Sequence, residues 1–191
     1  MINIRKAKME DIAETQDICY VTANDLARPQ NRVWLFALYN DYYIRYQTDN
    51  CFVAVDDKDK AVGYILCCID FNDYCRKMKK IFLPIVRRSN FKQYLLARIE
   101  MSLNKKQVRQ GYTAHMHIDI LPEYQRIGVG RRLVDELVKH LQAIGVSRLT
   151  LTCSVSNTKG VNFYRQYGFK DIGKLPGAII FGLDIVNKNL E

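Results

Sequence analysis

A turn with two glycines, set between a strand pattern and an amphipathic helix pattern, constrains this chain more than any other feature. Residues 114–121 alternate like a strand, and Pro122 ends the alternation. After the turn at 125–130, apolar side chains recur on one helical face before a glycine that suits a helix C-terminus, at Leu133, Leu137, Leu141 and Ile144. The sequence therefore predicts a strand over 114–121 and a helix over 130–144, with the glycines at the start of the helix.

This position of the glycines favours the binding of an anion. The first N–H groups of a helix lack intrahelical partners, and glycine lets the backbone close on a ligand. Arg126, Arg131 and Arg132 add positive charge. Because each charge-assisted hydrogen bond is worth about 1.5–3 kcal/mol, a diphosphate is the ligand that this combination predicts.

Two familiar phosphate-binding turns do not fit the sequence. A P-loop needs Gly-Lys-Ser/Thr, but Gly130 is followed by two arginines. A dinucleotide-binding turn needs a third glycine where Leu133 stands, and an acidic residue about 20 positions further on, where this chain has a threonine-rich strand pattern. Nucleotide hydrolysis and hydride transfer are therefore not expected.

A second motif follows downstream, with Asn157 and then the run Phe163-Tyr164-Arg165-Gln166-Tyr167-Gly168-Phe169. QxxGxG between a strand and a helix, followed by Asn and FYxxxGF, resembles the acetyl-CoA signature of the GNAT superfamily of N-acetyltransferases. Residues 4–7 with 11–12, and residues 62–64, are similar to the N-terminal half of that family. The resemblance covers most of the chain outside 71–113.

The resemblance implies an α/β (α+β) fold with a mixed, mostly antiparallel sheet flanked by helices, whose central strands splay to hold acetyl-CoA. It also implies direct acetyl transfer to an amine in a ternary complex, with a backbone N–H near Ile118 stabilising the oxyanion. The residues that it places around acetyl-CoA are Ile118, Ile120, Gln125, Arg126, Ile127, Gly128, Val129, Gly130, Arg131, Asn157 and Tyr164.

Two of these residues have alternative roles. Tyr164 is the candidate general acid for the departing CoA thiolate, because a phenol with a pKa of about 10 is protonated at neutral pH; core packing beside Phe163 and Tyr167 is its other role. Asn157 corresponds to a residue that contacts the cofactor in the family, and a helix N-cap is its structural alternative. Both roles of Asn157 can hold together.

No motif identifies the general base. His115, His117 and Asp119 alternate onto one face of the strand over 114–121, and a histidine that titrates near neutrality suits proton abstraction from an amine. Ala114 stands about where some family members carry a glutamate. His117 is the preferred candidate, with Asp119 or a water relay as alternatives, whereas His115 and His140 are expected to be structural or exposed.

The segment 71–113 carries eleven basic and two acidic side chains, and so accounts for the whole net charge of +9. We predict an insertion that is partly helical over 91–103 and broken at Pro84. It stands where the family often builds an acceptor lid, so an acidic acceptor is one hypothesis and a solvated face is the other. The charge also permits nucleic-acid binding, but no RNA-recognition or zinc-finger motif supports it.

A narrower likeness involves residues 76–80 before Leu83-Pro84, residues 117–122 and residues 177–182. These segments resemble the acetyltransferase-like C-terminal domain of O-GlcNAcase and its bacterial relatives. A catalytically inactive module that binds acetyl-CoA is therefore an alternative to the enzyme.

Composition sets the remaining bounds. With 191 residues, 48% of them apolar and 26% charged, the chain has the size and balance of a single soluble domain over 1–191. It shows no signal-peptide or membrane-spanning pattern, so we expect a cytoplasmic monomer or homodimer that acts on a small-molecule or peptide amine. The six cysteines form no CxxC pair and no zinc-ligand pattern, which predicts buried thiols and no metal site.

The other elements follow from simple patterns. We predict strands over 2–7, 51–55, 61–68, 148–153, 169–174 and 179–183, and helices opening at 9–12, around 34–46 and over 158–167.

Overall fold

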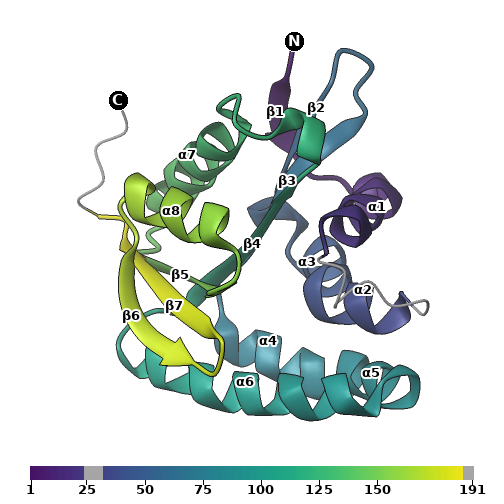
Figure 1. Cartoon of the computed structure of the whole chain (residues 1–191), viewed down its shortest axis with the longest axis vertical. Helices are drawn as coiled ribbons and strands as arrows, with labels where there is room; N and C mark the ends of the chain where they lie inside the picture. The colour runs from purple at the N-terminus through teal and green to yellow at the C-terminus, as the bar shows by residue number, and fades with distance from the viewer. Residues whose placement is uncertain (24–31, 187–191) are drawn as a thin grey trace.

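The computed structural model describes residues 1–23 and 32–186, and in them a seven-stranded sheet carries helices on both faces (Figure 1). In sheet order β1-β2-β3-β4-β5-β7-β6, every neighbouring pair is antiparallel except the central pair β4–β5. The expected mixed, mostly antiparallel sheet is confirmed. The strands are β1 (Asn3–Lys6), β2 (Phe52–Val55), β3 (Ala61–Cys68), β4 (Ala114–Ile120), β5 (Arg148–Ser154), β6 (Lys170–Leu175) and β7 (Ala178–Asp184).

The single parallel pair is short and then opens. Ala114 lies opposite Leu149 and His115 opposite Thr150, and the register of β4 and β5 goes no further. On its other side, β4 stays paired with β3 as far as Ile120. The two central strands therefore separate beyond His115, and this gap is called the split below.

Two layers of helices cover the sheet. Helices α7 (Val129–Ala143) and α8 (Thr158–Tyr167) lie on one face, and α1 (Ile12–Thr22), α2 (Val33–Tyr39) and α3 (Asp41–Tyr46) lie on the other. Figure 1 shows α4 (Phe71–Lys77), α5 (Leu83–Ser89) and α6 (Phe91–Arg109) across one end of the sheet. Three short 3-10 turns connect elements, at Met9–Asp11, Thr48–Asn50 and Pro122–Tyr124.

Strand β3 links the two hydrophobic cores that these layers enclose. All of its residues are buried, and successive side chains enter opposite cores, Cys67 on the α7 side and Cys68 on the side of α1 to α6. The predicted stripe of α7 is buried at Leu133, Leu137 and Leu141. The cysteines are buried and free, as expected.

The predicted break at Pro84 is wrong. The chain is helical from Phe71 to Ser89, because a π-helical turn, Met78–Phe82, joins α4 to α5. Leu83 N–H donates to Met78 O across this wider turn, and Pro84, which has no N–H to donate, follows directly as the second residue of α5. The break falls at Asn90, whose side chain caps α6 by accepting from Gln93 N–H at 3.1 Å.

A second difference concerns the helix expected around 34–46, which is two helices. Asn40 separates α2 from α3 with φ −132° and ψ −62°, outside the helical region. Its buried side chain lies beside Thr15 of α1, so packing against α1 accompanies the bend.

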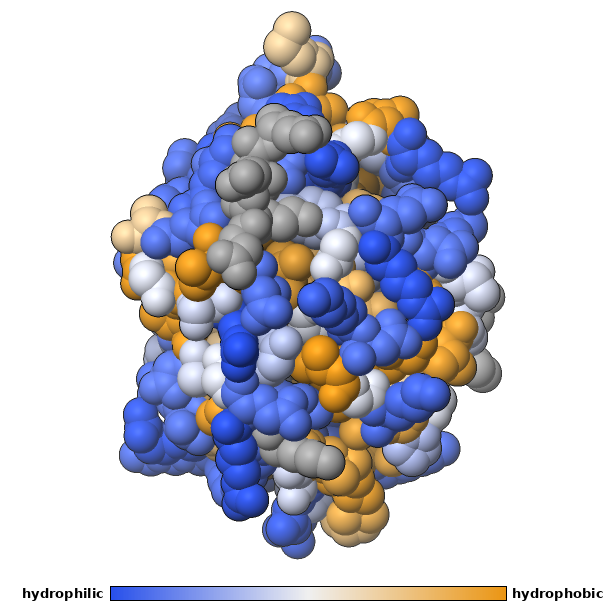
Figure 2. Space-filling model, turned by 90° about the vertical axis from the view of Figure 1, so that its left-hand side faces the viewer, coloured by the Kyte–Doolittle hydropathy of each residue, from blue (hydrophilic) through white to orange (hydrophobic). Residues whose placement is uncertain are grey.

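Of the described basic side chains of 71–113, nine are exposed. On the side of α7 and α8, hydrophilic residues predominate and apolar ones form separate patches (Figure 2). Within the described ranges, no helix combines the length and the apolar character needed to cross a membrane.

Candidate active site

The glycine turn lies at the start of α7, as predicted. Gly128 is the N-cap residue with φ 88°, in the left-handed region that favours glycine. The first backbone hydrogen bond of the helix runs from Arg132 N–H to Gly128 O at 3.1 Å. In the described part of the chain, the N–H groups of Val129, Gly130 and Arg131 therefore have no intrahelical acceptor. These donors fit a phosphate group.

At Gly130 close packing, and not the backbone conformation, favours glycine. A Cβ atom there would stand 3.3 Å from Ile120 Cδ1 and 3.5 Å from a ring carbon of Phe163. The glycine thus lets α7 approach β4 and α8 closely. The cofactor signature and the close contact between these three elements depend on the same residue.

The three arginines near the turn are not equivalent. Arg132 donates two hydrogen bonds of 3.0 Å to Ile2 O and so ties α7 to the residue that precedes β1. Arg131 makes a long ion pair of 3.8 Å with Asp135 and lies 5.9 Å from the ring centroid of Tyr167, and exposed Arg126 has no ion pair with any described residue. Arg126 and Arg131 are therefore the cations that can reach an anion at this turn, and the neighbouring Ile127 side chain is exposed.

The backbone of β4 directs polar groups into the split. Leu121 N–H donates to Val62 O at 2.9 Å, and in an antiparallel pair only alternate residues face the partner strand. Ile118 and Ile120 consequently turn their N–H and C=O groups away from β3, toward β5. Gln125 Nε2 donates to Ile120 O at 2.8 Å, whereas the groups of Ile118 face the split.

The polar side chains of β4 all face the layer of α1 to α6. Tyr43 Oη and His115 Nε2 share a hydrogen bond of 2.8 Å, and burial lowers the pKa of His115 to about 3. The ring of His117 lies edge-on to Tyr39 and Tyr43, with centroid distances of 5.5 and 5.3 Å, and burial lowers its pKa to about 4. Both imidazoles are neutral at pH 7.

Asp119 is the third member of this row. Burial raises its pKa to about 6, although the Tyr64 hydroxyl, which donates a hydrogen bond to its carboxylate, favours the ionised form. The carboxylate is thus held against β3 and α1.

Tyr164 lies on the opposite side of the sheet. Its ring is T-shaped to Phe169 and tilted to Phe181, with centroid distances of 5.7 and 5.6 Å. Burial, with smaller contributions from Cys153 and Asp119, raises its pKa well above the usual value for a phenol. The hydroxyl is therefore protonated at neutral pH, and it has no hydrogen-bond partner among the described residues.

Asn157 is the N-cap of α8. Its Oδ1 accepts from Gly160 N–H at 2.9 Å, and its side chain is exposed. The structural role that the sequence allowed is thus present, and it leaves the amide NH2 group of Asn157 facing solvent.

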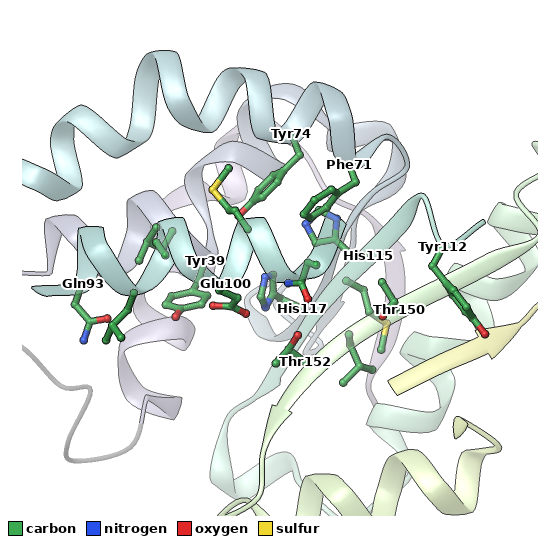
Figure 3. A pocket seen from close by; sticks show the side chains of 17 residues that line it. Tyr39, Phe71, Tyr74, Gln93, Glu100, Tyr112, His115, His117, Thr150 and Thr152 are labelled. Atoms are coloured by element: carbon green, nitrogen blue, oxygen red, sulfur yellow. The ribbon is translucent and has the colours of Figure 1, made fainter. Parts of the chain in front are cut away.

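A cavity of about 80 Å³ lies on the other face of the sheet, between α2, α4, α6 and the strands β4 and β5 (Figure 3). His117 lines it, and so does Glu100 of α6, whose side chain points into the cavity in Figure 3. Sequence reasoning missed Glu100. The available signal was its position on the helical face of Gln93, Ala97 and Asn104, as the one acidic residue of the basic helix α6.

No metal site accompanies these features. Within residues 1–23 and 32–186, no three His, Cys, Asp or Glu side chains are placed to share an ion.

Comparison with known proteins identifies the family. Residues 12–169 match the model of the Acetyltransferase (GNAT) family, and the chain belongs to that family. It is similar to the N-alpha-acetyltransferase of Sulfurisphaera tokodaii, with 24% identity over 170 residues that cover 88% of this chain and 80% of the relative.

Solved structures agree in fold. The protein called SsHAT is similar with a TM-score of 0.86 and 24% identity, covering 96% of this chain and 98% of that one. The PaiA N-acetyltransferase of Thermoplasma acidophilum, solved in complex with coenzyme A, has a TM-score of 0.61 and 14% identity, covering 96% of this chain and 99% of its own. As a member of the Acetyltransferase (GNAT) family, the protein is an N-acetyltransferase that binds acetyl-CoA. The narrower likeness to O-GlcNAcase is not shown by these comparisons.

Proposed function

We propose that the protein transfers an acetyl group directly from acetyl-CoA to a primary amine. Acetyl-CoA would bind on one face of the sheet and the amine on the other. The observation that supports this most is the split between β4 and β5. One side of it carries the start of α7 and the Tyr164 side chain, and the other side opens into the cavity lined by His117 and Glu100.

The donor side would hold acetyl-CoA, which supplies the acetyl group as an activated thioester. The N–H groups of Val129, Gly130 and Arg131 would receive the diphosphate, and Arg126 and Arg131 would balance its charge. In the split, Ile118 N–H is positioned to stabilise negative charge on the carbonyl oxygen of the thioester. Side-chain substitution at Ile118 leaves this donor in place.

Tyr164 is proposed to protonate the leaving sulfur. It is a protonated phenol on the donor side, and its hydroxyl has no hydrogen-bond partner among the described residues. Its ring contacts with Phe169 and Phe181 would hold the hydroxyl in position.

Of the two proton acceptors predicted on β4, His117 fits the acceptor side better. It lines the cavity, whereas Asp119 bonds to Tyr64 and does not line it. With a pKa of about 4, however, His117 is a weak base, so we expect it to accept a hydrogen bond from the amine rather than to keep its proton.

The acceptor amine is not identified by these features. The S. tokodaii relative is named for N-alpha acetylation, and this makes peptide N-termini the first acceptors to test.

Calorimetric titration of acetyl-CoA into the wild-type protein and two glycine variants tests the donor site. Gly128 and Gly145 lie at opposite ends of α7, both have positive φ, at 88° and 76°, and neither has another atom within 4 Å of an added Cβ. Gly128→Ala and Gly145→Ala therefore impose a similar backbone strain of about 1 kcal/mol. We expect micromolar binding to the wild type and to Gly145→Ala, and at least about tenfold weaker binding to Gly128→Ala. Absence of binding to the wild type would refute the proposed function.

A further inference from the structure

The cavity under α6 meets the split. Its lining includes Met116 and His117 of β4 and Leu151 and Thr152 of β5, the residues immediately after the last paired positions of these strands. An acceptor in the cavity would therefore reach the place where the thioester is expected, from the face opposite α7 and α8.

Glu100 is the one acidic residue in the lining of the cavity. Among the described residues that line it none is a lysine or an arginine, and burial raises the pKa of the Glu100 carboxyl. The other titratable groups that face the cavity are neutral at pH 7, namely Tyr39 of α2, Tyr74 of α4, Tyr112, and His115 and His117 of β4.

The cavity also holds polar atoms that lack partners. In the described part of the chain, Asn104 Oδ1 and His115 Nδ1 are buried without a hydrogen-bond partner, and Glu100 makes neither a hydrogen bond nor an ion pair. Asn104 follows Glu100 by one helical turn of α6, so the two side chains share a face. A carboxylate and an amide oxygen on one face are acceptors suited to an ammonium group, which has three N–H donors.

We propose that this cavity binds the acceptor as a primary alkylammonium ion and that Glu100 accepts its proton, acting as the general base of the transfer. The inference rests on the proposed function, since it assigns the acceptor side of the same site. Glu100 of α6 would then have the role that a glutamate of the central strand has in some members of the family. This chain has Ala114 at about that position of the strand.

The proton balance is complete without another reagent. The ammonium ion loses one proton to Glu100, which passes it to water. The free amine forms the new N–C bond to the acetyl carbon, and the C–S bond breaks. After the N–C bond forms, the nitrogen loses a second proton to water, while Tyr164 gives one proton to the sulfur and recovers one from water. One proton is therefore released in each transfer.

The Glu100 carboxylate would also determine which acceptors bind. A carboxylate close to the amine would be placed beside Glu100 in a poorly solvated cavity, where like charges repel strongly. Acceptors with an uncharged chain next to the amine should react, and acceptors with an acid group there should not. An acidic portion of an acceptor would have to lie outside, on the exposed basic residues of 71–113.

The first test compares Glu100→Gln with the wild type. We measure CoA release with ethylamine and with 2,2,2-trifluoroethylamine, a much weaker base of similar size that needs no base to free its lone pair at neutral pH. Loss of a general base should lower kcat/KM for ethylamine by about 100-fold or more, and the deficit should shrink at least about tenfold with the fluorinated amine. Glu10→Gln, at an exposed residue of the first 3-10 turn, is the matched control and should match the wild type.

The pH profile of kcat/KM distinguishes a general base from a residue that only supports the structure. Burial raises the pKa of Glu100, so the acid limb of kcat/KM in the wild type should lie above the usual glutamate range and should be absent in Glu100→Gln. Equal deficits for both amines, or an unchanged acid limb, would overturn the assignment of Glu100.

The second test compares propylamine with β-alanine, which differ by one terminal carboxylate. The wild type should use propylamine at least about tenfold better in kcat/KM, and Glu100→Gln should reduce this preference. Equal use of both, or reaction of neither amine nor of ethylamine, would refute the cavity as an alkylammonium site. Acetyl-CoA titration of the same samples separates this result from failure of the donor site, because Glu100→Gln should bind acetyl-CoA as the wild type does.

Discussion

Tyr164 shows how one side chain can be both packed and chemically available. Three aromatic rings contact it, those of Phe163, Phe169 and Phe181, yet its hydroxyl has no hydrogen-bond partner among the described residues. Removal of the hydroxyl alone should therefore leave the packing intact. This separates the two roles that the sequence left open.

Tyr164→Phe should lower kcat by about 100-fold, the usual contribution of a general acid, and leave acetyl-CoA affinity and the free energy of unfolding nearly unchanged. Turnover is measured by CoA release and affinity by calorimetry. Tyr46→Phe is the control, since Tyr46 is an exposed tyrosine of α3 that also packs through its ring. If turnover of Tyr164→Phe equals that of the wild type, the residue serves packing only.

For Asp119 we predict an effect of pH on stability rather than on turnover. Its pKa rises from 3.8 to about 6 on folding, so the folded state favours the protonated carboxyl. This contribution to stability is fully present below pH 3.8 and is lost as the pH rises through about 6.

Asp119→Asn keeps a neutral hydrogen-bond acceptor for Tyr64 at every pH. Between pH 4 and pH 7, the wild type should therefore lose about 2 kcal/mol of unfolding free energy relative to this variant, at about 1.4 kcal/mol per pKa unit with some screening by solvent. Denaturant unfolding at several pH values measures the difference. A difference that stays constant across this range would show that the carboxyl titrates normally in the folded protein.

At the scale of elements, the strongest sequence patterns predicted the positions of helices and strands well. The helix over 130–144 is α7, one residue displaced at each end, because its apolar positions and its flanking glycines agree. Local patterns could not locate the bend at Asn40, which accompanies contact with α1, or the π-helical turn that accommodates Pro84. Both depend on neighbours that are distant in sequence or on a rare helical geometry.

The candidate site also has one part that local sequence patterns can predict and one part that they cannot. The proposed donor side is made of contiguous motifs, so the sequence could nominate residues for it, and their roles stay predictions. The cavity on the acceptor side joins α2, α4, α6 and β4, and no local pattern shows that Glu100 and His117 line one cavity.

The role of Asn157 as the N-cap of α8 can be tested by substitution. Asn157→Asp should preserve the hydrogen bond to Gly160 N–H and the stability of the protein, because Asp caps as well as Asn, whereas Asn157→Ala should lose about 1 kcal/mol. If Asn157 also contacts the cofactor, both variants should bind acetyl-CoA more weakly, since both remove the amide N–H donors. Unchanged affinity in both variants would leave Asn157 as a cap only.

At the scale of the whole molecule, the sheet separates the proposed donor site from the proposed acceptor site. The turn at the start of α7 and the cavity under α6 lie on opposite faces, and the split joins them. A covalent acetyl-enzyme would need an accessible nucleophile beside the split. The described cysteines are buried, and burial raises the pKa of Cys19, Cys51, Cys67, Cys68, Cys75 and Cys153.

This arrangement predicts a sequential mechanism. With acetyl-CoA and a reactive amine varied together, double-reciprocal plots of initial rate should intersect, and CoA should compete with acetyl-CoA but not with the amine, because each ligand has its own face of the sheet. Parallel lines, with exchange of label between acetyl-CoA and CoA in the absence of amine, would instead require an acetylated enzyme. That result would contradict direct transfer and move the search for a nucleophile to side chains near the split, Thr152 first, since its hydroxyl lines the cavity where the strands separate.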